Sequence, residues 1–180
     1  MVELLSAPPP PDVISRLTAI PGVRITPTVL ATQEGSERQL GPEAAGAILM
    51  LQATFVDEVK AAEFWNAAAG LLEQLATAPG FIRRWNFTDG PHYTLIALWR
   101  SAAEARAFAA SPRHEEAVRD LYRRRWQFSH FAALWEIDAP RPRVIFCSAC
   151  DGVTPAAEAT CRGCGTELFD PYRSERHVDR

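Results

Sequence analysis

The four cysteines of the chain stand close together near its C-terminal end, as two pairs with the same internal spacing. Cys147 and Cys150 form one pair, and Cys161 and Cys164 form the other. Two intervening residues let both sulfurs of a tight turn reach one ion, and the ten residues between the pairs suffice for a hairpin that brings the turns together. Four thiolates are the ligands of a closed, tetrahedral Zn²⁺ site, which leaves no position for a catalytic water. We therefore predict a structural zinc site, with two disulfides or four reduced thiols as the alternatives.

The residues around these cysteines resemble the short zinc ribbons that are common in prokaryotic proteins. Phe146 precedes the first cysteine, Gly165 follows the fourth, and Thr166–Leu168 continues the pattern. Asp151 stands where such ribbons often carry glycine, so Gly152 is expected to supply the left-handed turn one place later. The resemblance implies a zinc ribbon over residues 146–172.

The amino-acid composition argues against several classes of protein, among them nucleic-acid-binding and membrane-spanning proteins. Apolar residues make up 47% of the 180 positions, and 19 basic against 22 acidic residues give a net charge of −3. The six arginines and six acidic residues after position 140 cancel, so the ribbon lacks the basic excess of a nucleic-acid-binding module. No run approaches the roughly 18 apolar residues of a membrane span. We expect a cytoplasmic protein with no nucleic-acid or membrane partner, because the N-terminus also lacks signal-peptide features and zinc-bound cysteines fit a reducing compartment.

Changes in composition divide the chain into five parts. Residues 1–45 hold a proline run and an expected extended segment at Val23–Leu30, and form an extension that either clasps the next domain or is partly disordered. The dense, aromatic region 46–138 is the main domain. Residues 139–145 form a stiff proline- and arginine-rich linker, which leads into the ribbon, 146–172, and then a solvated tail, 173–180.

The main domain alternates between strand and helix patterns. Asp57 is a candidate cap for its first helix, Ser101 and Glu104 form a capping box for its second, and Pro112 interrupts that second helix. The order is βαββαβ, which predicts an α+β, ferredoxin-like fold. The expected strands are 47–56, 81–87, 92–100 and 128–137, and the expected helices are 57–77 and 101–122.

The first strand predicts a homodimer. Strand alternation sends Leu49, Leu51, Ala53 and Phe55 to one face, and Ile48, Met50, Gln52 and Thr54 to the other. The helices of a ferredoxin-like unit cover one face only, so the second face needs cover. A second sheet from an identical chain is the simplest cover, and it would make a dimeric α/β barrel.

Residues 47–137 resemble the antibiotic-biosynthesis monooxygenase family of dimeric α/β barrels. That family includes cofactor-free oxygenases of aromatic polyketides, haem-degrading enzymes and proteins that process signal molecules. The resemblance implies a monooxygenase that is either cofactor-independent or haem-using, and no Gly-x-Gly-x-x-Gly fingerprint indicates a flavin or nicotinamide. The motifs that carry the resemblance are Leu49–Thr54, Ala78–Phe81, Ala97–Ser101, Ala105–Phe108, Ser111–His114 and Leu134–Glu136.

Two polar residues are the candidate catalytic groups. Gln52 interrupts an apolar strand, where the haem-degrading relatives carry asparagine, and its amide could bond a substrate oxygen or be satisfied structurally. His114 follows the helix break and could relay protons, bind haem iron or simply cap the helix. Arg83 and Arg84 are consecutive, so only one of them can point inward toward an anionic or phenolate substrate. The predicted substrate-binding set is Met50, Thr54, Arg83, Trp85 and Trp135.

Two functions follow from these residues. The first is an oxygenase that acts on an aromatic or polycyclic metabolite in an apolar pocket, with the zinc ribbon as a structural element. The alternative is a non-catalytic barrel that binds a small ligand or haem while the ribbon docks on a partner protein. Haem is the less favoured cofactor, because Phe108 stands near where the haem-degrading relatives need tryptophan.

Overall fold

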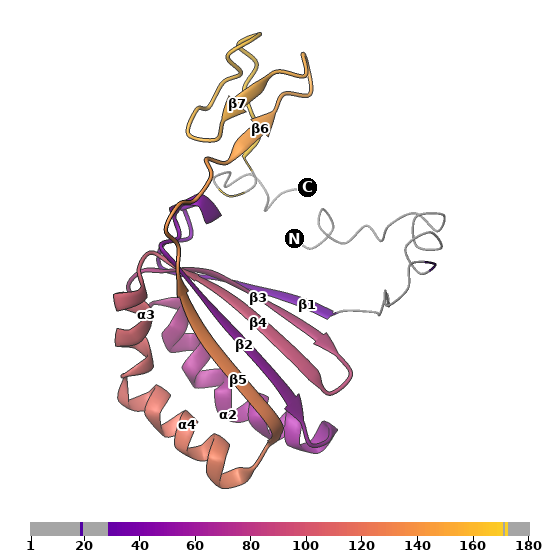
Figure 1. Ribbon diagram of the computed structural model, residues 1–180, viewed down its shortest axis with the longest axis vertical. Coiled ribbons are helices and arrows are strands. Elements are labelled where there is room, and N and C mark those ends of the chain that lie inside the picture. The colour runs from indigo at the N-terminus through magenta and orange to yellow at the C-terminus, as the bar shows by residue number, and fades with distance from the viewer. Residues whose placement is uncertain (1–18, 20–28, 171, 173–180) are drawn as a thin grey trace.

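The computed structural model describes residues 19, 29–170 and 172 (Figure 1). In this part of the chain, five strands form one antiparallel sheet with the order β1-β3-β4-β2-β5, and three helices lie on one of its faces. A separate two-stranded hairpin carries the cysteines. The strands are β1 (Val29–Glu34), β2 (Ala47–Phe55), β3 (Phe81–Asp89), β4 (His92–Trp99), β5 (Gln127–Glu136), β6 (Val144–Phe146) and β7 (Val153–Pro155), and the helices are the 3₁₀ turn η1 (Pro42–Ala44), α2 (Glu58–Ala76), α3 (Ala102–Ala109) and α4 (Pro112–Arg124).

The predicted α+β, ferredoxin-like fold is confirmed. Strands β2 to β5 and the helices between them follow the βαββαβ order, with β2 and β4 in the middle of the sheet. The observed β3 runs two residues beyond the predicted end at Phe87, because Thr88 and Asp89 still pair with Tyr93 and His92 of β4.

Side-chain caps set the helix boundaries. The Asp57 carboxylate accepts the Lys60 amide at 2.7 Å and begins α2. Ser101 and Glu104 form the predicted capping box, in which the Ser101 hydroxyl accepts the Glu104 amide at 3.2 Å and donates to its carboxylate at 2.8 Å. Ser111 caps α4 directly before Pro112, so the predicted helix break separates α3 from α4.

The hydrophobic core lies between the sheet and the helices. Trp99 at the end of β4 is 1% exposed and packs between Phe81 of β3 and Phe108 of α3, with ring centroids 5.2 and 5.6 Å away. Further along the sheet, Trp65 of α2 meets Tyr93 of β4 at 5.0 Å in an edge-on arrangement. These contacts fix α2 and α3 on the same face of the sheet.

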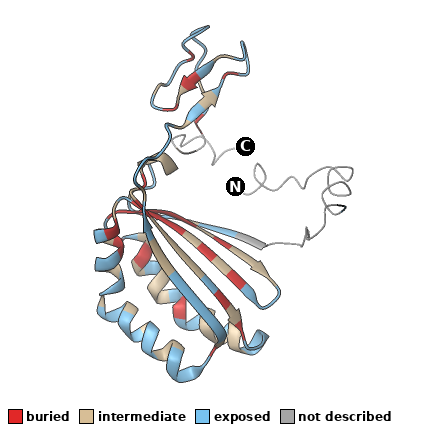
Figure 2. Cartoon of the chain, viewed as in Figure 1, coloured by how far each residue is buried: buried red, intermediate tan, exposed pale blue. Residues whose placement is uncertain are grey.

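The opposite face carries the predicted second row of β2. Ile48, Met50, Gln52 and Thr54 pair with Leu98, Ile96, Thr94 and His92 of β4, and with Trp135, Ala133, Phe131 and Ser129 of β5. We call this surface the open face. The segment before β2 covers one end of it, where Leu40 and Ala45 pack with Ile48, Ile82 and Leu98. Beyond this cover the face is solvated, and Phe131 and Trp135 are 49% and 46% exposed. Figure 2 shows β5 coloured largely as exposed.

Strand β1 comes from the predicted N-terminal extension. It pairs with β3 from Val29↔Thr88 to Glu34↔Arg83, and so adds a fifth strand at the edge of the ferredoxin-like unit. The backbone after β1 stays on the sheet, since the Gly35 amide donates to the Ile82 carbonyl at 3.0 Å. Most of the expected extended segment, 23–28, and the predicted tail, 173–180, lie outside the described residues.

An ion-pair cluster ties the hairpin region to the domain. Arg143, directly before β6, bonds Glu43 of η1 at 2.8 Å and Asp170 at 2.7 Å. The ring of Tyr172 lies 4.6 Å from the Arg83 guanidinium and 4.9 Å from that of Arg143. Burial opposes the charge on Arg143, but its hydrogen bonds to Asp170 and Glu43 raise its pKa. This cluster joins the N-terminal segment, β3, the linker and the ribbon.

None of the helices in the described part of the chain is long and apolar enough to cross a membrane.

Replacing Arg143 by methionine keeps most of its apolar stem but leaves the Glu43 and Asp170 carboxylates without this cation. Their side chains are only 23% and 10% exposed, so we expect the change to lower the free energy of unfolding by about 1–3 kcal/mol. Denaturant titration followed by circular dichroism measures this loss.

The matched control is Arg106→Met, which breaks the ion pair to Glu136 between side chains that are 63% and 67% exposed. Exposed pairs contribute little, so this control should leave stability nearly unchanged. Equal effects of the two substitutions would show that the cluster does not hold the ribbon.

Candidate metal centre and small-molecule pocket

The four cysteine sulfurs converge on one point. All four Sγ atoms lie within 4.8 Å of one another, and the Cys147–Cys164 and Cys150–Cys161 pairs are 3.7 and 3.6 Å apart. A tetrahedral zinc ion with sulfur ligands at about 2.3 Å requires sulfur–sulfur distances of about 3.8 Å. None of the four is in a disulfide. The residues therefore fit one tetrahedral metal ion.

The two cysteine turns have the same backbone geometry. In each, the amide two residues after the first cysteine donates to its sulfur at 3.4 Å, from Ala149 to Cys147 and from Gly163 to Cys161. In each, the residue four places after that cysteine donates its amide back to the cysteine carbonyl and has a left-handed backbone. The β6–β7 hairpin and the Thr160–Glu167 bridge hold the two turns face to face.

The residue that supplies the left-handed turn after Cys150 is Asp151, with φ 56°, and the expectation that Gly152 supplies it was wrong. Short polar side chains tolerate this conformation better than most residues do. Gly152 is needed for a different reason, because a Cβ atom there would lie 3.2 Å from the sulfurs of Cys150 and Cys161. Gly165, with φ 75°, holds the equivalent left-handed position in the second turn.

The backbone amides also favour thiolates. Hydrogen bonds from the Cys164 and Gly163 amides lower the pKa of Cys161 to about 6, and the Thr166 hydroxyl lowers the pKa of Cys164. The Gly152 amide acts in the same direction on Cys150, but the neighbouring sulfurs of Cys164 and Cys161 raise the pKa of Cys150 to about 12. Metal binding needs the deprotonated ligand, so these donors favour the metal-bound form. Zinc held by four thiolates would fix the fold of the ribbon and would have no open position for Lewis-acid chemistry.

The two predicted catalytic residues lie on opposite sides of the sheet. Gln52 is exposed on the open face, between Thr94 of β4 and Phe131 of β5. His114 lies in the first turn of α4, on the helix side, where its ring contacts Phe108 at 5.6 Å. Within one subunit the structure does not bring these two side chains together.

The predicted substrate-binding residues share the open face with Gln52, as their register on the sheet requires. Arg83 is 7% exposed and pairs with Glu34 at 3.3 Å, while Trp135 is 46% exposed. A shallow, polar hollow of about 380 Å³ lies around Gln52, with Thr54 hydrogen-bonded to His92 at 3.1 Å in its wall. The remaining members, Met50 and Trp85, are partly buried on this face.

His114 is half-buried and lines neither the hollow around Gln52 nor the pocket between α2 and α3. Burial lowers its pKa, and a backbone hydrogen bond to Ala109 opposes that shift. Burial therefore favours the neutral imidazole. In this position the His114 ring packs edge-on against the Phe108 ring.

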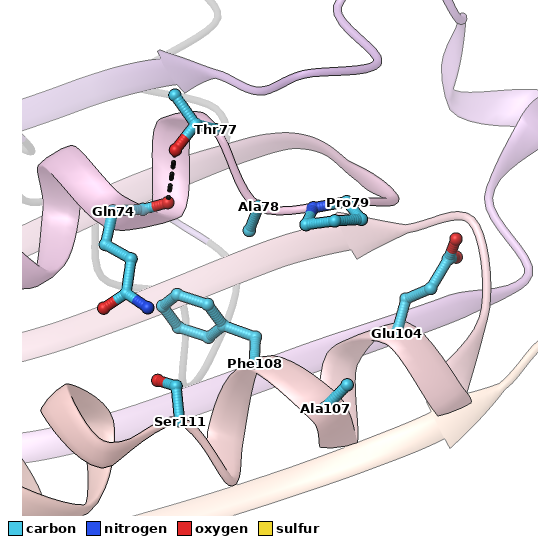
Figure 3. Close-up of a pocket in the computed structure, with 8 residues that line it drawn as sticks. All are labelled: Gln74, Thr77, Ala78, Pro79, Glu104, Ala107, Phe108 and Ser111. Atoms are coloured by element: carbon cyan, nitrogen blue, oxygen red, sulfur yellow. Dashed lines mark hydrogen bonds between the residues drawn. The ribbon is translucent and has the colours of Figure 1, made fainter.

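The helix side contains a more apolar pocket of about 320 Å³, where the end of α2 meets α3 (Figure 3). The Phe108 ring forms its inner wall, and Figure 3 shows the Gln74 amide beside that ring. The Gln74 Oε1 atom is buried and has no hydrogen-bond partner in the described part of the chain. The pocket is lined by Gln74, Thr77, Ala78, Pro79, Glu104, Ala107, Phe108 and Ser111.

The other polar groups of this pocket are already engaged. Glu104 is hydrogen-bonded to Arg100 and Ser101, and the bond from Arg100 lowers its pKa. Ser111 caps α4, and the Thr77 hydroxyl donates to the Gln74 carbonyl at 3.2 Å. The pocket thus has one aromatic wall, and its lining residue Gln74 carries a buried oxygen without a hydrogen-bond partner among the described residues. Sequence reasoning missed Gln74, whose only signal is a polar residue between Leu72 and Leu75.

Comparison with known proteins gives a family for the central part of the chain. Residues 47–120 match the family described as antibiotic biosynthesis monooxygenase, and the match ends before β5 and the cysteines. No curated protein matches the sequence.

Solved structures with a similar fold include three whose identity to this chain is low. A conserved protein from Methanosarcina mazei Go1 is 16% identical, with 53% of this chain and 97% of that chain covered and a TM-score of 0.46. SnoaB, a cofactor-independent oxygenase from Streptomyces nogalater, is 17% identical. The match covers 54% of this chain and 97% of SnoaB, with a TM-score of 0.42. The third is a monooxygenase from the gene ActVA-Orf6 of Streptomyces coelicolor, in complex with nanaomycin D. It is 21% identical, and the match covers 53% of this chain and 90% of that chain, with a TM-score of 0.45.

The arrangement of the four cysteines predicts one metal ion per chain. Mass spectrometry of the native protein should find one zinc ion per chain, and Cys161→Ser should lose it because one of four ligands is gone. The ribbon should then unfold while the helical circular dichroism signal of α2 to α4 persists, since the ribbon contributes no helix in the described residues.

Ser148→Ala is the matched control, because this exposed side chain lies between the ligands and removes no sulfur. It should keep the zinc. Iron in place of zinc, or a mass that shows two disulfides, would contradict the assignment.

Proposed function

We propose that the chain, whose residues 47–120 match the antibiotic biosynthesis monooxygenase family, oxidises a hydroxylated aromatic metabolite bound between α2 and α3. The observation that carries the location is the pocket itself, where the Gln74 amide lies against the Phe108 ring and the Gln74 Oε1 is buried without a partner among the described residues. An acceptor buried without a donor costs free energy, and a turn of the Gln74 side chain that brings Oε1 to the pocket would let a ligand hydroxyl recover it. The volume of about 320 Å³ lies within the range of small-molecule sites, which is roughly 300–1,000 Å³.

The reaction that suits these residues uses electrons from the substrate itself. A methylene carbon between aromatic rings loses a proton to give a carbanion, which reduces O₂. One oxygen atom becomes the new carbonyl of the product, and the other leaves as water with the two hydrogens of the methylene group. In this scheme Gln74 accepts the substrate hydroxyl and Phe108 stacks on its ring, and the pocket supplies orientation.

The open face supports a homodimer. Outside the part that the segment before β2 covers, it presents Met50, Ile96, Phe131 and Trp135 as a continuous surface across β4, β2 and β5. Large apolar residues on a flat sheet face are typical of protein interfaces. A second chain would bury this surface together with the predicted ligand residues Gln52 and Thr54, which makes the dimer interior the second candidate location for a ligand.

A non-catalytic role is the second candidate function, and one observation favours it. Three large apolar residues of the ribbon are exposed, Phe146 by 72%, Val153 by 52% and Phe169 by 53%, and Val144 at the end of the linker is exposed by 43%. Phe146 and Val153 are direct partners in the β6–β7 hairpin and therefore share a face. Such a surface suits docking on a partner protein, with the domain as a ligand-binding module.

Two glutamine substitutions separate the two ligand locations. Dithranol, a hydroxylated aromatic with a methylene between its rings, should be oxidised faster than its spontaneous autoxidation, as measured by oxygen uptake. Gln74→Leu removes the acceptor on the helix side and should lower the catalysed rate about tenfold. It should not lower thermal stability, because Gln74 Oε1 has no partner to lose among the described residues.

Gln52→Leu is the same substitution on the open face. A rate loss with Gln52→Leu and none with Gln74→Leu would move the site into the dimer interior. Thermal stabilisation by 1,8-dihydroxyanthraquinone without any catalysed oxygen uptake would favour the binding-module function.

The dimer is tested by adding a charge to the open face. Met50→Arg places a cation in the centre of the expected interface, so light scattering should show a shift from twice 19.9 kDa toward a single 19.9 kDa chain. Tyr122→Arg adds the same charge to an exposed position of α4, 69% accessible, and should leave the dimer intact. A wild-type protein that is already monomeric would contradict the barrel.

A further inference from the structure

Arg84 occupies an unusual position for a charged residue. It lies in β3 opposite Ala97 of β4 and Gln33 of β1, and its side chain enters the helix side of the sheet. The residue is only 6% exposed. Helix α2 lies above it, as the bond from Gln33 to the Leu72 carbonyl shows. The site is separate from the α2–α3 pocket, whose lining does not include Arg84.

The neighbours of Arg84 are neutral. Its Nε donates to the Gln33 Oε1 at 2.6 Å, and the Gln33 Nε2 donates in turn to the Leu72 carbonyl at 2.6 Å. The Tyr93 hydroxyl is the other polar neighbour, and burial raises the pKa of Tyr93 to about 12, so it stays a neutral phenol. Asn86, which accepts from Tyr93 at 3.4 Å, is also neutral.

The other well-buried guanidinium groups of the described chain have carboxylate partners. Arg83, adjacent in sequence and 7% exposed, pairs with Glu34 at 3.3 Å. Arg143 pairs with both Glu43 and Asp170. Within residues 29–170 and 172, no carboxylate pairs with Arg84. A buried cation without a counter-charge is costly, because it loses its hydration and gains only neutral acceptors.

We propose that Arg84 anchors a second small-molecule site, beneath α2 at the β1 edge of the sheet, which binds the carboxylate of an organic acid. The Gln33 amide oxygen is then a neutral stand-in for a carboxylate oxygen. A carboxylate would replace one neutral hydrogen bond by charge-assisted bonds, and it matches the guanidinium fork with two oxygens. Gln33 belongs to an edge strand and is only partly buried, so its side chain can move aside for the ligand.

The test uses the full-length, metal-bound protein and benzoate as the probe. Benzoate at about tenfold its dissociation constant should raise the melting temperature by about 3 °C or more relative to sodium chloride at equal ionic strength. Benzamide, its neutral analogue, should have no such effect. Arg84→Met should abolish the benzoate response, and Arg83→Met should retain it because Arg83 lies on the other face.

Gln33→Ala keeps the proposal testable if Arg84→Met does not fold. It removes the neutral stand-in and leaves the guanidinium accessible, so the benzoate response should be larger than in the wild type. A wild type and a Gln33→Ala variant that both ignore benzoate would overturn the proposal, as would an unchanged response in Arg84→Met. Dithranol oxidation is measured separately, so failure here leaves the proposed oxygenase pocket untouched.

Discussion

The alternation of side chains along the central strands β2 and β4 is the constraint on which the rest of the structure depends. Each strand sends one row of residues toward α2 and α3 and the other row toward the open face. The helices complete a core around Trp99 on one side. On the other side, the segment before β2 covers only one end of the sheet. One surface is thereby suited to enclosing a small molecule, and the other to meeting a second chain.

The same alternation gives two consecutive arginines different roles. Arg83 faces the open side, where Glu34 neutralises it and Tyr172 stacks on it. Arg84 faces the helices, where its polar neighbours among the described residues are the neutral Gln33 and Tyr93, with Asn86 beyond Tyr93. Arg143 then links Arg83 and Tyr172 to the ribbon, so a metal ion bound by the four cysteines would stabilise a segment that also contacts the domain. The ribbon is a fixed part of the molecule at this point, and the predicted linker 139–145 contains its anchor.

Local chemistry made much of the fold predictable. Caps at Asp57, Ser101 and Ser111 need only neighbouring residues, and the cysteine spacing alone predicts the cluster of four sulfurs. The Glu43–Arg143 pair spans one hundred residues, so no local pattern could reveal it. Gln74 likewise could not be selected from sequence, because it becomes a pocket residue only where the end of α2 packs against α3 in the folded chain. Gln52 stands out in the sequence because it interrupts an apolar strand. In the structure that strand is only partly buried, and Gln52 is exposed.

Hydrogen–deuterium exchange in the presence of 1,8-dihydroxyanthraquinone tests the central claim most directly, because it shows which face of the sheet binds the ligand. We predict slower exchange in residues 74–79 at the end of α2 and in residues 104–111 of α3, with no ligand-dependent change at 50–54 of β2 or 129–135 of β5. Protection confined to β2 and β5 would contradict the account, because it would place the ligand on the open face and leave the pocket between α2 and α3 without a function.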